Sequence, residues 1–210
     1  YMGARLVITA TEGLASEVRK DVPEANVKCV YNGFPVELMN RRPVKHERFT
    51  VCFHGVLGFF QDVETLLKVA ERLLPHGVDV VVIGYGRNQE PLKKTTLANV
   101  HFLGRQSFDD TIKAVESCHL GLCLRLDDNI SKDAFPVKVW EYLGLGIPSI
   151  ITPPCEAGYF VAEHGCGLVR KSGDFDAIVS SILALKAEPA RIDEMSGRCR
   201  IVASRYTREQ

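Results

Sequence analysis

The sequence predicts an α/β fold in which helices cover both faces of a parallel sheet, and three observations favour it. From residue 49 onward, short β-branched runs alternate with amphipathic stretches, as in sheets whose parallel strands are joined through helices. One of these stretches, 63–74, has apolar residues at helical spacing. The chain has 210 residues, of which 46% are hydrophobic and 25% charged, and a globular chain of this size buries roughly 70% of its unfolded surface.

The first unit of the alternation is a strand at 49–54 that ends in Gly55. The helix after it has one apolar face at i, i+3, i+4 and i+7 spacing, made of Val63, Leu66, Leu67, Ala70, Leu73 and Leu74. Pro75 and Gly77 end this helix, since neither continues helical geometry well.

The later units repeat this order, with about six strands and six or seven helices in all. Further strands are expected at 78–83, 99–103, 119–124, 148–152 and 166–169. Further helices are expected at 87–96, at 108–117, from Pro136 onward, and at 157–164, 174–187 and 190–204. The segment 125–133 is polar and is expected to be a loop.

The segment before this series predicts a separate, incomplete unit. Residues 1–34 contain a strand at 5–10, a helix at 11–20 and a strand at 27–31, and 35–48 is a charged linker with two prolines. A single strand-helix-strand unit cannot bury both of its faces, so we expect the larger part of its domain to be missing from the chain. The predicted organisation is therefore 1–34, 35–48 and a main domain at 49–210.

The charge balance argues against binding by general electrostatics. Lys and Arg together number 26, as do Asp and Glu, so no net positive field attracts nucleic acid or an anionic membrane. No apolar stretch approaches the roughly 20 residues that cross a bilayer. We expect no nucleic-acid partner and at most peripheral membrane contact, and any anion must be held by a local site.

The cysteines indicate location rather than chemistry. Seven cysteines form an odd set without a C-x-x-C pair, at Cys29, Cys52, Cys118, Cys123, Cys155, Cys166 and Cys199. This set is typical of reduced, buried thiols in a cytoplasmic protein. Because the six histidines are scattered singly, no metal site is expected.

Ligands of open parallel sheets bind beyond the carboxyl ends of the strands, so the residues that follow each strand are the candidates for binding. Gly55 and Gly58 follow the first strand, and Gly84 and Gly86 follow the second. Glycines at such turns let the backbone approach a phosphate with its N–H groups. A tight turn without a ligand remains the alternative for both pairs.

The third strand and one histidine supply further candidates. Phe102 and Gly104 end the strand at 99–103, and Arg105 follows with a guanidinium that could reach a phosphate or a base; an exposed arginine is the alternative. His54 ends the first strand and could donate to a phosphate or hydroxyl, although a core histidine with satisfied hydrogen bonds is the more common case.

Lys138 carries the strongest signal. Pro136 suits the first position of a helix, which places Lys138 at the third. A helix N-terminus carries about half a positive charge, so a cation there is disfavoured by about 0.3–1 kcal/mol unless an anion lies between them. A bound phosphate would reverse that effect. Glu141 shares the face of Lys138, and the alternative for the two is a surface ion pair.

In their order along the chain, these segments resemble the nucleotide-sugar-binding domain of glycosyltransferases with the B-type fold of two Rossmann-like domains. The resemblance covers nearly all of 49–187 and rests on Phe53-His54-Gly55, Val82-Ile83-Gly84-Tyr85-Gly86, Asn99-Val100-His101-Phe102-Leu103-Gly104, Pro136-Val137-Lys138-Val139-Trp140-Glu141-Tyr142-Leu143, Gly146-Ile147-Pro148 and Glu163-His164-Gly165-Cys166-Gly167-Leu168-Val169. The chain is most similar to the large retaining family, group 1 or family 4, whose motif separates two acidic residues by seven others. These residues are Asp133 and Glu141 here, with Asp133 where the family usually has Glu.

The resemblance implies a role for each candidate. Lys138 would hold the donor diphosphate, Glu141 would accept hydrogen bonds from the ribose, and Asp133 would contact the transferred sugar. The backbone from Phe102 to Arg105 would hold the base, and the turn from Gly55 to Gly58 would lie against the diphosphate. A nucleotide diphosphate sugar is then the substrate, and neither a cofactor nor a metal is needed, because a lysine and a helix terminus can stabilise the departing diphosphate.

Two departures from the family leave alternatives open. Val56 and Gln61 stand where the family usually has an arginine and a lysine on the diphosphate. Either Lys138, Arg87 or Arg105 compensates, or the donor binds weakly, or catalysis has been lost. The resemblance also implies an acceptor domain, similar at its end to 1–34, without which the chain should transfer sugar poorly or not at all.

The first hypothesis is therefore a glycosyltransferase donor domain that serves an unknown sugar or lipid-linked acceptor, in cell-surface polysaccharide assembly. A non-catalytic nucleotide-binding or scaffold module of the same fold is the second hypothesis. A sugar-nucleotide epimerase of the same two-domain fold is the third.

Overall fold

The centre of the molecule is a six-stranded parallel sheet. The computed structural model describes residues 3–39 and 41–209, and within them the strands of this sheet are β3 (Thr50–Val56), β4 (Asp79–Tyr85), β5 (Val100–Gly104), β6 (Leu120–Leu124), β7 (Ser149–Thr152) and β8 (Gly167–Val169). Their spatial order is β5-β4-β3-β6-β7-β8, and every pairing is parallel. The chain thus winds outward from the centre in both directions, and the winding reverses between β3 and β6, where doubly wound sheets bind ligands.

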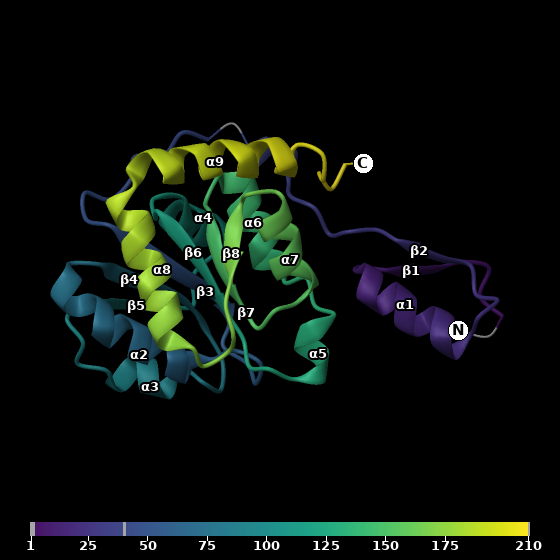
Figure 1. Cartoon of the computed structure of the whole chain (residues 1–210), viewed down its shortest axis with the longest axis horizontal. Helices are drawn as coiled ribbons and strands as arrows, with labels where there is room; N and C mark the ends of the chain where they lie inside the picture. The colour runs from purple at the N-terminus through teal and green to yellow at the C-terminus, as the bar shows by residue number, and fades with distance from the viewer. Residues whose placement is uncertain (1–2, 40, 210) are drawn as a thin grey trace.

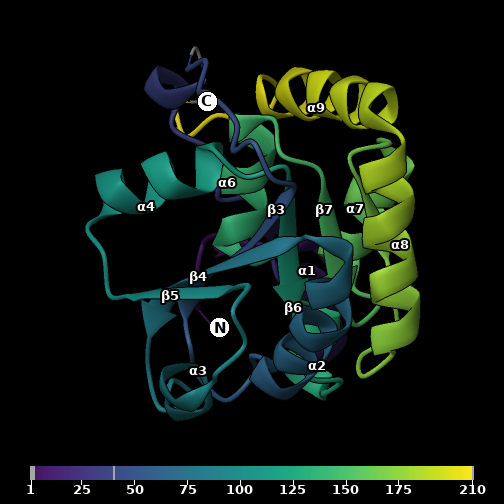
Figure 2. The same cartoon turned by 90° about the vertical axis from the view of Figure 1, so that its left-hand side faces the viewer.

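Helices cover both faces of this sheet, as Figures 1 and 2 show. The helices on one face are α2 (Val63–Leu73), α3 (Glu90–Lys94) and α8 (Phe175–Ala187). The helices on the other face are α4 (Phe108–Glu116), α6 (Val137–Leu145) and α7 (Glu156–Glu163), and α9 (Pro189–Ala203) contributes to the cores on both faces. These positions confirm the predicted α/β architecture.

Alternation along the strands explains the two cores. Val51 and Phe53 of β3 pack with α2 and α8, whereas Cys52, between them, packs with α4 and α6. Successive side chains of a strand point to opposite faces, so a strand that is buried on both sides must be apolar at nearly every position. The β-branched runs of the sequence have this origin.

The leading unit consists of β1 (Val7–Thr9), α1 (Glu12–Asp21) and β2 (Val27–Cys29), which form a two-stranded parallel sheet with one helix. Figure 1 shows it beside the main domain. The segment that leads from it to the sheet is anchored by Phe34, which is fully buried and pairs with the backbone of the C-terminal tail at Thr207. Gly144 of α6 makes room for this ring, since a Cβ there would lie 2.0 Å from Phe34 Cδ1.

Two local predictions were wrong. Gly55 and Gly84 lie inside β3 and β4, opposite each other in the register, and not in turns after them. The loop 125–133 contains one helical turn, α5 (Asn129–Lys132), because the side chain of Asp128 accepts a hydrogen bond from Ser131 N and caps it. The predicted linker contains a 3₁₀ turn at Val36–Leu38.

The position of Lys138 also shifts by one residue. Pro136 is the N-cap of α6, with extended backbone angles, and not its first helical residue. Lys138 is therefore the second residue of the helix, still in the first turn, where the dipole argument holds. Within the described part of the chain, no helix has the length and apolar character needed to cross a membrane.

Candidate functional site

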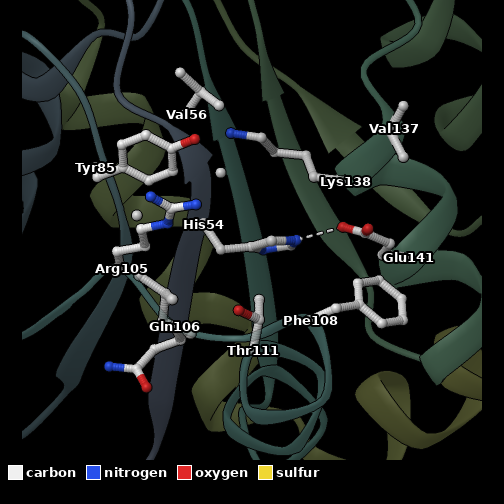
Figure 3. A pocket seen from close by; sticks show the side chains of 13 residues that line it. His54, Val56, Tyr85, Arg105, Gln106, Phe108, Thr111, Val137, Lys138 and Glu141 are labelled. Carbon is white, nitrogen blue, oxygen red and sulfur yellow. Dashed lines mark hydrogen bonds and ion pairs between the residues drawn. The ribbon is translucent and has the colours of Figure 1, made fainter.

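A pocket of about 330 Å³ opens at the carboxyl ends of β3 and β4 (Figure 3). Its walls come from these two strands, from the segment between β5 and α4, and from the first turns of α6. The predicted site residues that line it are Gly55, Gly84, Arg105, Lys138 and Glu141. Five candidates from distant parts of the sequence therefore meet in one cavity.

Lys138 reaches from α6 across to β3. Its Nζ donates to Oε1 of Gln61 at 3.0 Å and lies 4.4 Å from the centre of the Phe53 ring. An added Cβ at Gly55 would lie 3.5 Å from the same nitrogen. Only 8% of Lys138 is exposed, and burial lowers the pKa of its amine, which the neighbouring Arg125 charge lowers further.

Within the described part of the chain, no carboxylate pairs with the Lys138 amine at this end of α6. Among the described residues, no Asp or Glu oxygen lies within 4.0 Å of the Lys138 amine. The helix has neither a side-chain cap nor an acidic residue in its first turn, whereas α2, α4 and α8 are each capped by an Asp or Ser side chain. The partial positive charge of the helix end and the lysine therefore act together on the pocket.

Glu141 is held by a buried histidine. Nε2 of His54 lies 2.6 Å from Oε2 of Glu141, and the dashed line of Figure 3 marks this pair. Nδ1 of His54 lies 3.1 Å from the hydroxyl of Tyr142. Burial lowers the pKa of His54, and the nearby Lys138 charge lowers it too, although Glu141 acts in the opposite direction. A neutral imidazole that donates to Glu141 through Nε2 would accept at Nδ1 from the Tyr142 hydroxyl. The single proton of this hydroxyl also lies within reach of Leu122 O at 3.1 Å and Cys52 O at 3.2 Å.

The Glu141 carboxylate remains ionised. Burial alone would raise its pKa, but the hydrogen bond from His54 and the charge of Lys138 outweigh burial, so the pKa lies below its usual value. Oε2 is used by His54, and Oε1 has no hydrogen bond to any described residue. One oxygen of an ionised, fixed carboxylate is therefore available to a hydroxyl in the pocket.

The base-side candidates lie along the opposite wall. The guanidinium of Arg105 stacks on the Tyr85 ring, 4.7 Å from its centre, and both residues line the pocket. Gly104 has φ +65, where glycine is favoured. Phe102 packs against the core, so only its backbone is oriented for a role outside the core.

Gly84 of β4 and Gly86, just after the strand, have a packing explanation. An added Cβ at Gly84 would lie 2.0 Å from Gly55 O, and one at Gly86 would lie 2.6 Å from Leu57 O. Close approach of two backbones therefore requires glycine at both positions, with or without a ligand. Neither Gly86 nor Gly58 lines the pocket; Gly58 O accepts a hydrogen bond from Asn88.

Asp133 lies apart from the pocket. It is the residue after α5, and its Oδ1 would be 2.5 Å from a Cβ added at Gly13 of α1. The N-terminus of α1 is also contacted by Glu156, whose carboxylate accepts from the backbone N–H groups of Glu12 and Gly13 at 3.0 and 2.7 Å. The structure therefore places Asp133 between the main domain and the leading unit.

Several pocket residues escaped the sequence reasoning. Gln106, Phe108, Thr111 and Val137 line the cavity. The first three lie in or just before α4 and follow no motif, whereas Val137 belongs to the α6 motif but was not named as a candidate. The sequence favours a core role for His54 over a binding role. In the structure His54 is buried and also lines the pocket. No cluster of three or more His, Cys, Asp or Glu suited to a metal ion occurs among the described residues.

Comparison with known proteins finds one matching family and several solved structures with a similar fold. Residues 37–201 match the family described as glycosyl transferases group 1. No curated protein matches the chain. Among solved structures, HepE of Anabaena in complex with UDP and glucose is similar with a TM-score of 0.78 at 19% identity, over 97% of this chain and 59% of that chain.

Two further structures have the same fold. Sucrose-phosphate synthase from Thermosynechococcus elongatus gives a TM-score of 0.80 at 15% identity, over 99% of this chain and 55% of its own. WaaG, a glycosyltransferase involved in lipopolysaccharide biosynthesis, gives 0.75 at 14% identity, over 94% of this chain and 58% of its own. At these identities the likeness shows the Rossmann-like fold. The chain spans 55% to 59% of the length of these three proteins.

Proposed function

Because the chain belongs to the glycosyl transferases group 1 family, we propose that it is the donor-binding half of a glycosyltransferase and holds a nucleotide diphosphate sugar in the pocket beside β3. One observation carries this proposal: the Lys138 amine and the uncapped N-terminus of α6 present positive charge at the carboxyl edge of the sheet, with no carboxylate between them among the described residues. A diphosphate is the anion whose length and charge suit this arrangement.

The proposed chemistry is departure of the nucleoside diphosphate. Cleavage of the anomeric bond leaves negative charge on the diphosphate, and a lysine and a helix terminus that are oriented in advance stabilise that charge. Lys138 would thereby lower the barrier, and no divalent cation is required. Asp133 would contact the transferred sugar at the boundary with the leading unit.

The remaining pocket residues would position the nucleoside. The free oxygen of Glu141 would accept from a ribose hydroxyl, and the Tyr85–Arg105 stack, with the backbone near Gly104, would lie beside the base. The HepE structure contains UDP and glucose, which supports a nucleoside diphosphate of this class. The acceptor site would belong to an acceptor domain that ends in the leading unit, and the acceptor would be a sugar or lipid-linked sugar of polysaccharide assembly.

Calorimetric titration tests the proposal. UDP, GDP and their sugars are titrated into the wild-type chain and into Lys138→Ala, with an exposed lysine variant, Lys113→Ala, as the control. Micromolar binding of one nucleotide series that is lost in Lys138→Ala and kept in Lys113→Ala supports a donor site. If none of the nucleotides binds to the wild-type chain, the donor-site proposal is wrong.

A second candidate function is a scaffold module of the same fold. Val56 and Gln61 stand at two positions where cations are expected, and Gln61 engages the remaining Lys138 amine; both facts favour weak or absent donor binding. The same titration separates the two functions.

An epimerase would instead interconvert the free sugar nucleotide without any acceptor, which product analysis detects.

A further inference from the structure

Arg125 is a buried cation without a charged partner among the described residues. It follows β6 directly and is only 8% exposed. Its Nε has no hydrogen-bond partner, and among the described residues no carboxylate oxygen lies within 4.0 Å of its guanidinium. Its guanidinium carbon lies 5.5 Å from the centre of the Phe60 ring.

The backbone holds Arg125 firmly in place. Its N–H donates to Thr152 O at 3.1 Å, and Leu126 N donates to Phe60 O at 3.0 Å. Arg125 also forms an isolated antiparallel bridge with Gln61. These contacts fix the backbone of Arg125 at the carboxyl end of β6.

Arg125 and Lys138 are neighbours across Gln61. The Gln61 backbone pairs with Arg125, and its side-chain oxygen accepts from Lys138. The Arg125 charge also lowers the pKa of Lys138. Gln61 thus connects two buried cations at the point where the winding of the sheet reverses.

This arrangement is costly without an anion. Asp62 is also buried nearby, but its oxygens accept from Thr65 N and from Ser172, not from Arg125. An unpaired guanidinium withdrawn from water loses its hydration, and like charges nearby add repulsion. A bound oxyanion would satisfy the open N–H groups and offset both costs, since guanidinium groups bind phosphate oxygens in a bidentate manner.

We propose that Arg125 and Lys138 form a two-cation site for the diphosphate of the sugar donor, in which Arg125 supplies positive charge that Val56 and Gln61 do not. This inference rests on the proposed donor-binding function. It identifies the diphosphate as the anionic group held between β3 and β6, and it assigns Arg125 a direct contact with that diphosphate.

The test compares Arg125→Met, Arg125→Lys and a control, Arg191→Met, which changes a half-exposed arginine of α9 paired with Glu188. Each folded variant is titrated with the nucleoside diphosphate that the wild-type chain binds, with its nucleoside, and with inorganic pyrophosphate. We expect Arg125→Met to weaken diphosphate and pyrophosphate binding at least about tenfold, and to leave nucleoside binding unchanged. Arg125→Lys should fall between.

The melting temperature distinguishes a binding role of Arg125 from a structural role. Because Arg125→Met removes a buried charge without a partner, its melting temperature in the absence of nucleotide should equal or exceed that of the wild type. Lost binding together with a lowered melting temperature, unrelieved in Arg125→Lys, would overturn the proposal in favour of a structural role.

Two other results would also overturn it. Equal diphosphate affinity in Arg125→Met and the wild type would show that Arg125 does not contact this group. A loss confined to UDP-glucuronate, with UDP-glucose unaffected, would assign Arg125 to a carboxylate on the sugar. If the wild-type chain binds neither UDP nor GDP, the proposed function itself fails, and this result is distinct from the three above.

Discussion

Nε2 of His54 lies 2.6 Å from Oε2 of Glu141 and thereby links the end of β3 to the second turn of α6. His54 comes from the centre of the sheet, and Glu141 from the helix that also carries Lys138. The link helps to keep the carboxylate ionised and leaves Oε1 without a hydrogen bond to any described residue. The proposed ribose contact depends on this geometry.

We therefore predict that Glu141→Ala weakens nucleotide binding more than Asp133→Ala. Glu141 lines the pocket, whereas Asp133 lies against Gly13 of the leading unit. A hydrogen bond to a charged group contributes about 1.5–3 kcal/mol, so Glu141→Ala should lose about tenfold or more in affinity for UDP or GDP by calorimetry. Equal losses in the two variants would refute the ribose assignment.

Stability should fall as the solution becomes acidic. The pKa of His54 lies below its usual value, chiefly because the ring is buried. Below a pH of about 6.5, His54 binds a proton more readily in the unfolded chain than in the folded chain. The free energy of unfolding therefore falls with falling pH. Glu141, whose pKa is also lowered, adds a loss of the same sign at lower pH.

His54→Gln tests this linkage, because the amide nitrogen of glutamine can still donate to Glu141 without titrating. Urea unfolding between about pH 7 and 5 should show a smaller decrease in the variant than in the wild type. His119, whose burial also lowers its pKa, titrates in both proteins, so the difference between them is the quantity to compare. Identical slopes would contradict the account.

Features that depend on residues close together in the sequence could be predicted from the sequence. The spacing of the apolar residues of α2 and the β-branched run of β4 predicted those elements, because burial on a sheet produces each pattern directly. Lys138 and Glu141 were predicted as neighbours, because residues three apart share a helix face. Their meeting with Gly55 follows from the general rule that strand ends form the site.

Non-local contacts could not be predicted. The place of Asp133 beside Gly13 depends on how the leading unit rests on the main domain, which no local pattern encodes. The hydrogen bond between Lys138 and Gln61 joins residues 77 positions apart in the sequence. The resemblance therefore indicated that a cation is absent at position 61, but not that Gln61 accepts a hydrogen bond from Lys138. Arg125, whose guanidinium has no charged partner among the described residues, belongs to no motif of the sequence.

Gln61→Met should destabilise the protein. It removes the acceptor of the buried Lys138 amine, and an unsatisfied buried donor costs about 1–3 kcal/mol. The control is Gln106→Met, which changes an exposed residue of the same pocket and should stay within about 0.5 kcal/mol of the wild type. Urea unfolding measures both values, and equal stabilities would show that the amine does not need this partner.

Gly84→Ala should be more damaging than its size suggests. The added carbon would lie 2.0 Å from Gly55 O, at a φ of +150, so the ends of β3 and β4 must separate. We expect a loss of about 1–3 kcal/mol in the free energy of unfolding. Gly197→Ala, in a helix with open space around it, should instead gain up to about 1 kcal/mol.

The contact of Glu156 with α1 should hold the leading unit in place. Its carboxylate accepts from two backbone N–H groups of α1 and from the hydroxyl of Tyr31. Glu156→Ala should speed hydrogen exchange of the Glu12 and Gly13 amides and leave exchange in β3 unchanged. Glu163→Ala, at the other end of the same helix, is the control; equal exchange in both variants would argue against this anchor.

The most direct measurement is a crystal structure of the chain with the nucleoside diphosphate that it binds. We predict the diphosphate between the N-terminus of α6 and Gly55, with a phosphate oxygen bonded to Lys138 Nζ and the ribose hydroxyls at Glu141. A nucleotide bound elsewhere, with the Lys138 amine still on Gln61, would contradict the central claim that this pocket is a donor site.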